Sequence, residues 1–348
     1  MTSTSYYPGS TGAGRKLKQT DQDHVAEMLQ MIRAVLISLI LLANSVRAEQ
    51  LLTDVHFLIP AGPGGGWDGT ARGIGEAMVR SALITDVSYE NLSGGGGGRA
   101  IAKFIETAPR QKNTLLISST PMVVRSLQKI FPQSFRDLEP IASVIADYSC
   151  FAVHKDSPFN DWKDVVSEFL KTPRSVKVAG GSVRGSTDHF VIAHAFKLAG
   201  GNPRDLVYIP YDGGGKAMAG LLTRETQVLS TGLSEALEMH RAGEIRILAI
   251  TGDDRLPDTP LLPTLKEQGF DMSFANWRGF FAAPGHPDSH YGDMAHTLAA
   301  VINTPAFDTV RARNGWVTLH IERDQFYQFL EQQETEIGTL MRELGFLR

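Results

Sequence analysis

After residue 50 the chain alternates short apolar segments, glycine-rich loops and amphipathic segments, and this order constrains the fold more than any other feature. Each of four glycine-rich loops follows a predicted strand and precedes a predicted helix. The loops are Gly62–Gly66, Gly94–Gly98, Gly180–Ser186 and Gly213–Gly215. Strands that alternate with helices in this way form β-α-β units. The sequence therefore predicts an α/β fold of mostly parallel sheets flanked by helices.

Hydrophobic periodicity and capping residues place the individual elements. Strands are expected at residues 55–59, 87–90, 115–118, 141–146, 151–154, 176–179, 206–209, 227–230 and 245–250. Helices are expected at residues 68–81, 99–107, 121–129, 161–171, 187–198, 216–222, 235–241, 288–302, 306–314 and 323–344. Asp161 is expected to cap the helix that begins there. So many strands favour two units, divided near residue 153, with the second unit ending near residue 272.

Composition excludes several classes of protein. Hydrophobic residues make up 42% of the chain and charged residues 21%, so a mostly disordered chain is excluded. No apolar run reaches the roughly 18 residues that a membrane-spanning helix needs. The formal net charge is -4 and no basic stripe is present, so no nucleic-acid partner is expected.

The N-terminal region has the pattern of a targeting signal. Residues 34–43 form a short apolar core, preceded by Arg33 and followed by small residues up to Ala48. This pattern is typical of a secretory signal peptide that is cleaved after Ala48, so residues 1–48 are expected to be an N-terminal extension plus signal peptide. A membrane anchor or a buried helix is the alternative, although the run is too short to span a bilayer. Translation beginning at Met28 or Met31 would place the signal at the start of the chain.

Cys150 is the single cysteine, so the chain cannot form an internal disulfide. It lies in an apolar stretch, which predicts a buried, inert side chain, because a catalytic cysteine needs a base and an electropositive setting. His189 and His194 are five residues apart, which does not match the i, i+4 spacing of a helical zinc pair. We expect no metal site and no cofactor.

The glycine-rich loops predict an anion-binding site. They are placed at the carboxyl ends of parallel strands, where open α/β sheets bind ligands. Each loop also opens a helix, whose free N–H groups and positive dipole end attract anions. One such loop is often only a tight turn, but four favour a shared site. Arg184 would add a cation, while Asp68 has the alternative role of a helix cap and Trp67 that of a shield for its loop.

Enzymatic motifs fit these loops poorly. Gly64, Gly66 and Gly69 match the spacing of the dinucleotide fingerprint, but in so glycine-rich a loop the match is weak. Ser186 and His189 would act as a hydrolase pair only if they met in space, and no G-x-S-x-G elbow is present. We therefore expect no catalysis, with a secreted hydrolase that uses Ser186 and His189 as the alternative.

The segment PAGPGGGWDGTAR at residues 60–72 resembles the first loop of the tripartite tricarboxylate transporter receptors, the Bug-type solute-binding proteins. Further similar segments occur in the order of the family and extend over residues 50–348. They are residues 88–91, 181–189, 211–215, 246–251 with Arg255, 263–269 and 276–279. The chain departs from the family pattern at 91–98, where a stiff proline is missing, and at Arg184.

The resemblance implies a two-lobed periplasmic binding protein of the Venus flytrap, type II-like class. Residues 49–153 with 273–348 would form domain 1, and residues 154–272 would form domain 2. It implies a periplasmic receptor, not an enzyme, whose ligand is a carboxylate, either a tricarboxylate or a related organic acid. The ligand would pass to a membrane partner with one large and one small integral subunit. We expect a monomer, and a periplasmic sensor for a signalling kinase is the alternative function.

The resemblance also places the ligand between the first loop and the loop of the second domain, through backbone groups and waters. The expected ligand-binding residues are Ala61, Gly62, Pro63, Gly64, Gly65, Gly66, Trp67, Asp68, Ser119, Thr120, Gly181, Ser182, Arg184, Gly185, Ser186, Thr187, Asp188, His189, Tyr211, Gly213 and Gly214.

Overall fold

A computed structural model describes residues 51–347, together with Met1, Thr4 and Met31. The expected signal peptide and its cleavage site lie outside the described residues. Within the described part of the chain, no helix is long and apolar enough to cross a membrane.

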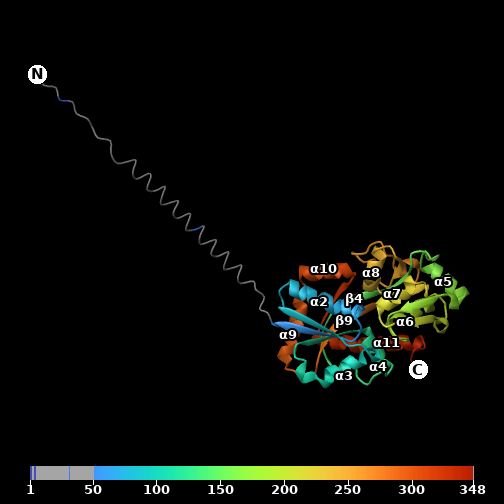
Figure 1. Cartoon of the computed structure of the whole chain (residues 1–348), viewed down its shortest axis with the longest axis horizontal. Coiled ribbons are helices and arrows are strands. Elements are labelled where there is room, and N and C mark those ends of the chain that lie inside the picture. The colour runs from blue at the N-terminus through green and yellow to red at the C-terminus, as the bar shows by residue number, and fades with distance from the viewer. Residues whose placement is uncertain (2–3, 5–30, 32–50, 348) are drawn as a thin grey trace. The chain divides into compact units, whose positions relative to one another are not determined.

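The elements alternate between strands and helices along most of the chain (Figure 1). The strands are β1 (Asp54–Ile59), β2 (Asp86–Asn91), β3 (Thr114–Ser119), β4 (Glu139–His154), β5 (Lys177–Gly180), β6 (Val207–Pro210), β7 (Val228–Gly232), β8 (Ile245–Ile250), β9 (Ala275–Ala282) and β10 (Val317–Glu322). The α-helices are α2 (Gly66–Arg80), α3 (Gly98–Glu106), α4 (Thr120–Leu127), α5 (Trp162–Lys171), α6 (Thr187–Leu198), α7 (Gly214–Leu222), α8 (Leu233–Arg241), α9 (Asp288–Val301), α10 (Pro305–Asn314) and α11 (Arg323–Glu343). The α/β class is confirmed, and Asp161 caps α5 by accepting a hydrogen bond from the Asp164 N–H at 2.9 Å.

Two parts of the element prediction are wrong. The segments 141–146 and 151–154 are one continuous strand, β4, because the polar residues between them keep their ladder pairing. Strands β9 and β10 were not predicted at all. In β10 most residues are only half-buried, so its apolar pattern is weak.

Strand β4 belongs to two groups of strands. The strand order is β2-β1-β3-β9-β4-β7-β5-β6, with β8 and β10 also paired to β4. Residues 139–148 of β4 pair with β9, and residues 149–154 pair with β7 and β8. We call β1, β2, β3, β9 and β10 with residues 139–148 the first strand group, and β5 to β8 with residues 149–154 the second strand group.

The outer strands of each group pair in parallel, whereas β4 and β9 pair with their neighbours in antiparallel orientation. Strand β1 runs parallel to β2 and β3, and β5 runs parallel to β6 and β7. Every partner of β4 runs antiparallel to it. The parallel strands therefore end together in each group, which brings the glycine-rich loops after β1, β2, β5 and β6 to their carboxyl ends.

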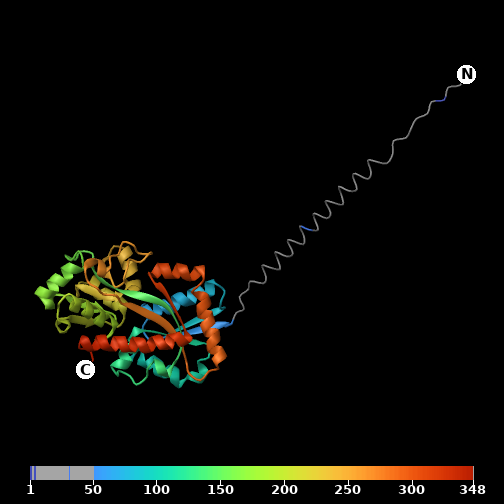
Figure 2. The same ribbon diagram turned by 180° about the vertical axis from the view of Figure 1, so that it is seen from behind.

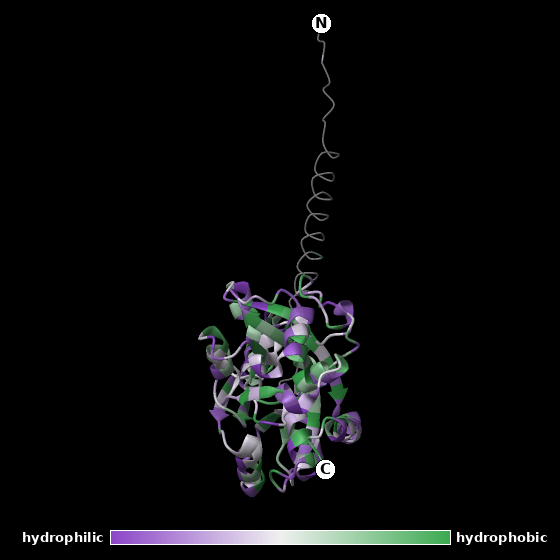
Figure 3. Cartoon of the chain, turned by 90° about the vertical axis from the view of Figure 1, so that its right-hand side faces the viewer, coloured by the Kyte–Doolittle hydropathy of each residue, from purple (hydrophilic) through white to green (hydrophobic). Residues whose placement is uncertain are grey.

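Apolar side chains on both faces of the strands form the core. Strand β4 is buried over almost its whole length, and Cys150 within it is fully buried. The prediction of a buried cysteine is confirmed, and burial raises the pKa of the Cys150 thiol. Figure 3 shows hydrophobic and hydrophilic bands alternating along the outer helices, as expected for helices with one buried face.

Helix α11 runs from the first strand group to the second (Figure 2). At its end Glu343 pairs with Lys197 of α6, with 3.2 Å between the charged atoms. The Phe346 ring then packs edge-on against His189, with 4.7 Å between ring centroids. The C-terminal segment therefore rests against the loop and helix that follow β5.

Two glycines of α2 provide a matched test of this packing. A Cβ at Gly73 would lie 2.8 Å from Val310 and 2.9 Å from Trp316, whereas a Cβ at Gly69 would meet nothing within 4 Å. We expect Gly73→Ala to lower the free energy of unfolding by about 1–3 kcal/mol through overpacking. We expect Gly69→Ala to raise it by about 0.5–1 kcal/mol. Urea unfolding of both variants checks this, and equal effects at the two positions would contradict the packing of α2 against α10.

Candidate ligand-binding cleft

A cavity of about 470 Å³ lies between the glycine-rich loops of the two strand groups, and we call it the main cavity. Of the residues expected to bind ligand, those that line it are Ala61, Gly62, Gly65, Gly66, Trp67, Ser119, Gly181, Ser182, Ser186, Thr187, Asp188, Tyr211, Gly213 and Gly214. Those that do not line it are Pro63, Gly64, Asp68, Thr120, Arg184, Gly185 and His189. The structure thus brings the loops together as a set, while several of the named side chains lie behind or outside the wall.

Helix N-termini from both strand groups converge on the main cavity. Helix α2 begins at Gly66, α6 at Thr187 and α7 at Gly214, and all three residues line the cavity. The second glycine loop, Gly94–Gly97, lines it as well, just before α3. Unpaired N–H groups at helix starts favour an anion, so the wall is suited to carboxylate oxygens.

The glycines allow the two loops of the second group to touch. A Cβ on Gly181 would lie 2.4 Å from the Gly214 nitrogen, so a side chain there would push the loops apart. The Gly213 N–H donates to the Gly181 carbonyl at 3.1 Å, and Gly213 has a φ of +97°, a conformation that disfavours other residues. These glycines therefore fix the shape of the wall.

Asp68 fastens the first loop from behind. Its carboxylate accepts hydrogen bonds from the Gly64 N–H at 3.0 Å, the Arg72 guanidinium at 2.9 Å and the Asn91 amide at 3.0 Å. Burial opposes its ionisation, but these three donors outweigh burial and hold the pKa of Asp68 below its ordinary value of 3.8. Gly65 is the N-cap of α2, so the expectation that Asp68 caps the helix is wrong in detail, since Asp68 lies inside the first turn and ties down the preceding loop.

Trp67 packs across the main cavity wall. Its indole N–H donates to Ser119 Oγ at 2.8 Å, which joins the first loop to the start of α4. A Cβ on Gly97 would lie 3.6 Å from the indole ring. Trp67 therefore both lines the cavity and holds three loop ends in place.

Ser182 and His189 stabilise the loop after β5. The Ser182 hydroxyl accepts from the Asp188 N–H at 3.1 Å, and the Ser182 carbonyl accepts from Tyr208 Oη at 2.6 Å. His189 Nδ1 accepts from the Gly185 N–H at 2.9 Å, and its ring stacks on Tyr208. Burial lowers the pKa of His189 to about 4, so the ring is neutral.

This geometry leaves the hydrolase alternative without support. Among the described residues no hydrogen bond joins Ser186 to His189, whose Nδ1 is occupied by the Gly185 N–H. A general base must lie within hydrogen-bond reach of its nucleophile. In the described ranges no cluster of three or more His, Cys, Asp or Glu residues is arranged to hold a metal ion.

Arg125 is a cavity-lining cation that was absent from the expected site. It extends from α4, is only 4% exposed and donates to Gln128 at 3.1 Å. No ion pair of Arg125 with a carboxylate occurs among the described residues, and its Nε has no hydrogen-bond partner. Burial lowers the pKa of Arg125 to about 10, so the guanidinium stays charged at neutral pH. The sequence feature that could have indicated Arg125 is its position as a lone arginine inside the apolar run of α4.

The second arginine that lines the main cavity, Arg278, forms an ion pair. Arg278 on β9 donates to Asp147 Oδ2 on β4 at 3.1 Å, and both side chains are buried. Asp147 also accepts from the Ser234 hydroxyl at 2.7 Å and the Ser234 N–H at 3.2 Å. Arg278 was visible in the sequence only within the family-like segment 276–279, and Asp147 only as a charge between the strands expected at 141–146 and 151–154.

Asp188 and Glu235 are two of the carboxylates that line the main cavity. Burial and the neighbouring Glu235 raise the pKa of Asp188 to about 7, although Ser182, Arg278 and the Gly181 N–H act in the opposite direction. Burial also raises the pKa of Glu235, whose Oε2 accepts from Thr231 Oγ1 at 2.7 Å. Glu235 was not among the expected site residues, because nothing in the sequence links α8 to the glycine loops.

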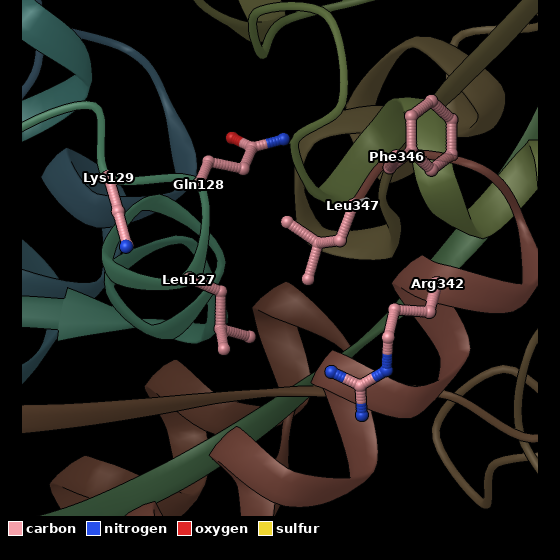
Figure 4. A pocket seen from close by; sticks show the side chains of 6 residues that line it. All are labelled: Leu127, Gln128, Lys129, Arg342, Phe346 and Leu347. Carbon is pink, nitrogen blue, oxygen red and sulfur yellow. The ribbon is translucent and has the colours of Figure 1, made fainter.

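A second cavity, of about 490 Å³, lies outside the glycine-rich loops. Figure 4 shows its six lining residues, which come from the end of α4 and from the C-terminal segment. Gln128 connects the two cavities, because it lines the second one and accepts a hydrogen bond at 3.1 Å from Arg125, which lines the main cavity. None of the residues expected to bind ligand lines this second cavity.

The role of Asp68 yields a pH-dependent prediction. Asp68→Asn should lower the free energy of unfolding at neutral pH by about 1–3 kcal/mol, because charge-assisted hydrogen bonds to Arg72 and Gly64 are weakened. The folded-state pKa is lowered, so the carboxylate stabilises the fold above pH 3.8 and the benefit fades as the pH falls below that value. Urea unfolding at neutral pH and near pH 3 measures the difference between variant and wild type. Asp86→Asn, at an exposed position, is the control, and a pH-independent difference for Asp68→Asn would contradict this role.

Known proteins resemble the chain over almost the whole described part. The sequence profile of the tripartite tricarboxylate transporter family receptors (TctC) matches residues 70–346. A UPF0065 protein from Bordetella pertussis is 25% identical, with 90% of this chain and 96% of that protein covered. The solved structure of the periplasmic binding protein BugD superposes with a TM-score of 0.76 at 23% identity, covering 84% of this chain and 98% of that one. MatC from Rhodopseudomonas palustris, solved with bound malate, superposes with a TM-score of 0.73 at 20% identity, covering 83% and 98%.

These similarities bear on both the fold and the family. The superpositions confirm the expected two-lobed α/β architecture of periplasmic binding proteins. The sequence profile covers well over half of the chain and includes most of the main cavity's loops. The chain therefore belongs to the family of tripartite tricarboxylate transporter receptors.

Proposed function

We propose that this protein is a periplasmic solute-binding receptor for a carboxylate, either a tricarboxylate or a related organic acid. It captures the acid in the main cavity and delivers it to the large and small integral subunits of a tripartite tricarboxylate-type transporter. It acts as a monomer without catalysis. The family membership supports this proposal, as does MatC, a fold relative that was solved with malate bound.

The observation that carries the proposal is the set of unpartnered donors around the main cavity. Among the described residues Arg125 Nε and Arg278 Nε have no hydrogen-bond partner, and neither does the buried hydroxyl of Thr187 at the start of α6. Buried polar groups that lack a partner are costly. An organic anion supplies acceptor oxygens, so it would offset this cost where a neutral apolar ligand would not.

Residues 49–153 with 273–348 are proposed to form one lobe, and residues 154–272 the other. The two strand groups support this division, because they share only β4 among their hydrogen-bonded strands. A ligand that is bound by loops of both lobes would stabilise the conformation in which the two lobes are closed around it. The stabilisation depends on how much more tightly the ligand binds the closed conformation than the open one. The segments near His154 and at 270–276 would then act as hinges.

The first test of this function is a thermal-shift screen of the chain from residue 49 onward. The panel contains citrate and other tricarboxylates, dicarboxylates, amino acids and aromatic acids. A ligand at about 100 times its Kd should add about 2.7 kcal/mol to the stability of the folded state, so the melting temperature should rise by a few degrees. The protein is first unfolded and refolded to remove carried-over ligand. If no organic acid raises the melting temperature, the carboxylate receptor is contradicted.

Arg125 offers a test in which stability and binding move in opposite directions. Arg125→Met removes a buried charge that lacks a carboxylate partner, so the ligand-free protein should melt at a higher temperature. The same change should weaken binding of the acid found in the screen about tenfold or more, because a charge-assisted hydrogen bond is lost. Differential scanning calorimetry and isothermal titration calorimetry measure the two effects. Lys163→Met, at an exposed position of α5, is the control for the loss of one positive charge, and unchanged affinity in Arg125→Met would exclude Arg125 from the site.

A further inference from the structure

We infer that the ligand carries an ammonium group in addition to its carboxylate, and that Asp188 and Glu235 form the subsite that receives this ammonium. The inference rests on the proposed function, because it names the class of organic acid that the same main cavity takes. It follows from the positions and partners of the two carboxylates.

Asp188 and Glu235 lie on the two sides of one backbone contact. The backbone of Gly181 favours ionisation of the Asp188 carboxylate and lowers its pKa, and a Cβ on Gly181 would lie 2.4 Å from the Gly214 nitrogen. A Cβ on Gly214 would in turn lie 2.2 Å from Glu235 Oε1. All four residues line the main cavity, so a ligand group placed at this contact meets both carboxylates.

Glu235 has an oxygen that is free to bind. Its Oε2 accepts from Thr231 Oγ1 at 2.7 Å and from the Gly232 N–H at 3.3 Å. Among the described residues no hydrogen bond to Oε1 is found. That oxygen is also the closest atom to a Cβ placed on Gly65, at 3.8 Å, so it faces the gap between the loops of the two strand groups.

The charges at this end of the main cavity do not balance. Three carboxylates, those of Asp147, Asp188 and Glu235, surround a single guanidinium, that of Arg278. Arg278 makes its ion pair with Asp147, at 3.1 Å. In the part of the chain that the structure describes, no ion pair of Asp188 or Glu235 with a cation occurs, and an ammonium group would supply one.

The opposite imbalance occurs at Arg125. A Cβ on Gly96 would lie 3.0 Å from Arg125 Nε, so this guanidinium lies against the glycine loop after β2, whereas Glu235 lies against Gly214 and Gly65. Among the described residues the wall thus offers a cation without a carboxylate partner at one place and carboxylates without an ion-pair partner at another. A plain dicarboxylate would satisfy Arg125 but would be repelled by Asp188 and Glu235, whereas an amino acid-like ligand complements both.

The change of ligand affinity with pH distinguishes an ammonium-bearing ligand from a plain dicarboxylate at this subsite. The pKa of Asp188 is about 7, raised by burial and by Glu235, and lowered in part by Ser182 and Arg278. An ammonium nearby would lower that pKa and release a proton, whereas a second carboxylate would raise it and take up a proton. Affinity for an ammonium-bearing ligand should therefore rise between about pH 6 and about pH 7.5, and affinity for a plain dicarboxylate should fall.

The experiment compares pairs of acids that differ only by one amino group: succinate with aspartate, glutarate with glutamate, and adipate with 2-aminoadipate. Isothermal titration calorimetry measures each Kd for the wild type and for Asp188→Asn and Glu235→Gln. In at least one pair the aminated acid should bind about tenfold tighter than its partner. Each variant should reduce this ratio about tenfold, partly because the plain acid binds better. Glu238→Gln, on the exposed side of α8, is the matched control and should leave the ratio unchanged.

The ratio of the two Kd values within each pair tests the ammonium subsite independently of the proposed carboxylate receptor. A plain acid that binds as tightly as its aminated partner in every pair would overturn the ammonium subsite and leave the carboxylate receptor standing. Loss of affinity for both members of a pair in the variants, at constant ratio, would also overturn it. If no acid of any pair binds and the screen of organic acids is negative as well, the proposed function itself fails.

Discussion

The buried Asp147 carboxylate forms an ion pair with Arg278 of the first strand group and also binds the start of α8, the helix that follows β7 of the second strand group. Asp147 lies on β4 just before the strand passes from the first group to the second, and Arg278 lies on β9 of the first group. Asp147 also accepts two hydrogen bonds from Ser234 at the start of α8, in the second group. Breaking such a pair leaves an uncompensated buried charge, which is far more costly than losing a surface ion pair.

The same ion pair explains why two positions of the cavity wall, Gly66 and Gly232, have no side chain. A Cβ on Gly66 would lie 2.3 Å from Arg278 Nη2, and a Cβ on Gly232 would lie 2.6 Å from Asp147 Oδ2. Helices α2 and α8 begin at or next to these glycines, so their N-termini approach the ion pair as closely as the backbone allows. The N-termini of α2 and α8 and the Asp147–Arg278 ion pair therefore lie next to one another because glycine at these two positions leaves room for the charged side chains.

Much of the fold was predictable because its determinants are local. Periodicity located nearly all helices, and helix 187–198 was predicted to the residue, since apolar spacing and glycine punctuation are properties of adjacent positions. Strand β4 was divided in two because Asp147 and Ser149 interrupt its apolar run, although both are buried and paired in the fold. The glycine loops of the site were predictable for the same local reason.

The charged residues of the site were harder to predict. Arg125, Arg278 and Glu235 come from α4, β9 and α8, and only the tertiary structure brings them to the glycine loops. Asp188 was predicted through its place in a loop motif, but its raised pKa depends on burial and on Glu235, both of which arise only in the tertiary structure. His189 was expected to touch ligand, yet it packs between Tyr208 and Phe346, and the second of these comes from the far end of the chain.

A crystal structure of the protein with the organic acid that gives the largest thermal shift is the most direct test of where the ligand is held. We expect the carboxylate within hydrogen-bond distance of Arg125 and of N–H groups from the loops of both strand groups. An acid bound instead in the second cavity of Figure 4, or one that leaves Arg125 without a partner, would contradict the proposed site.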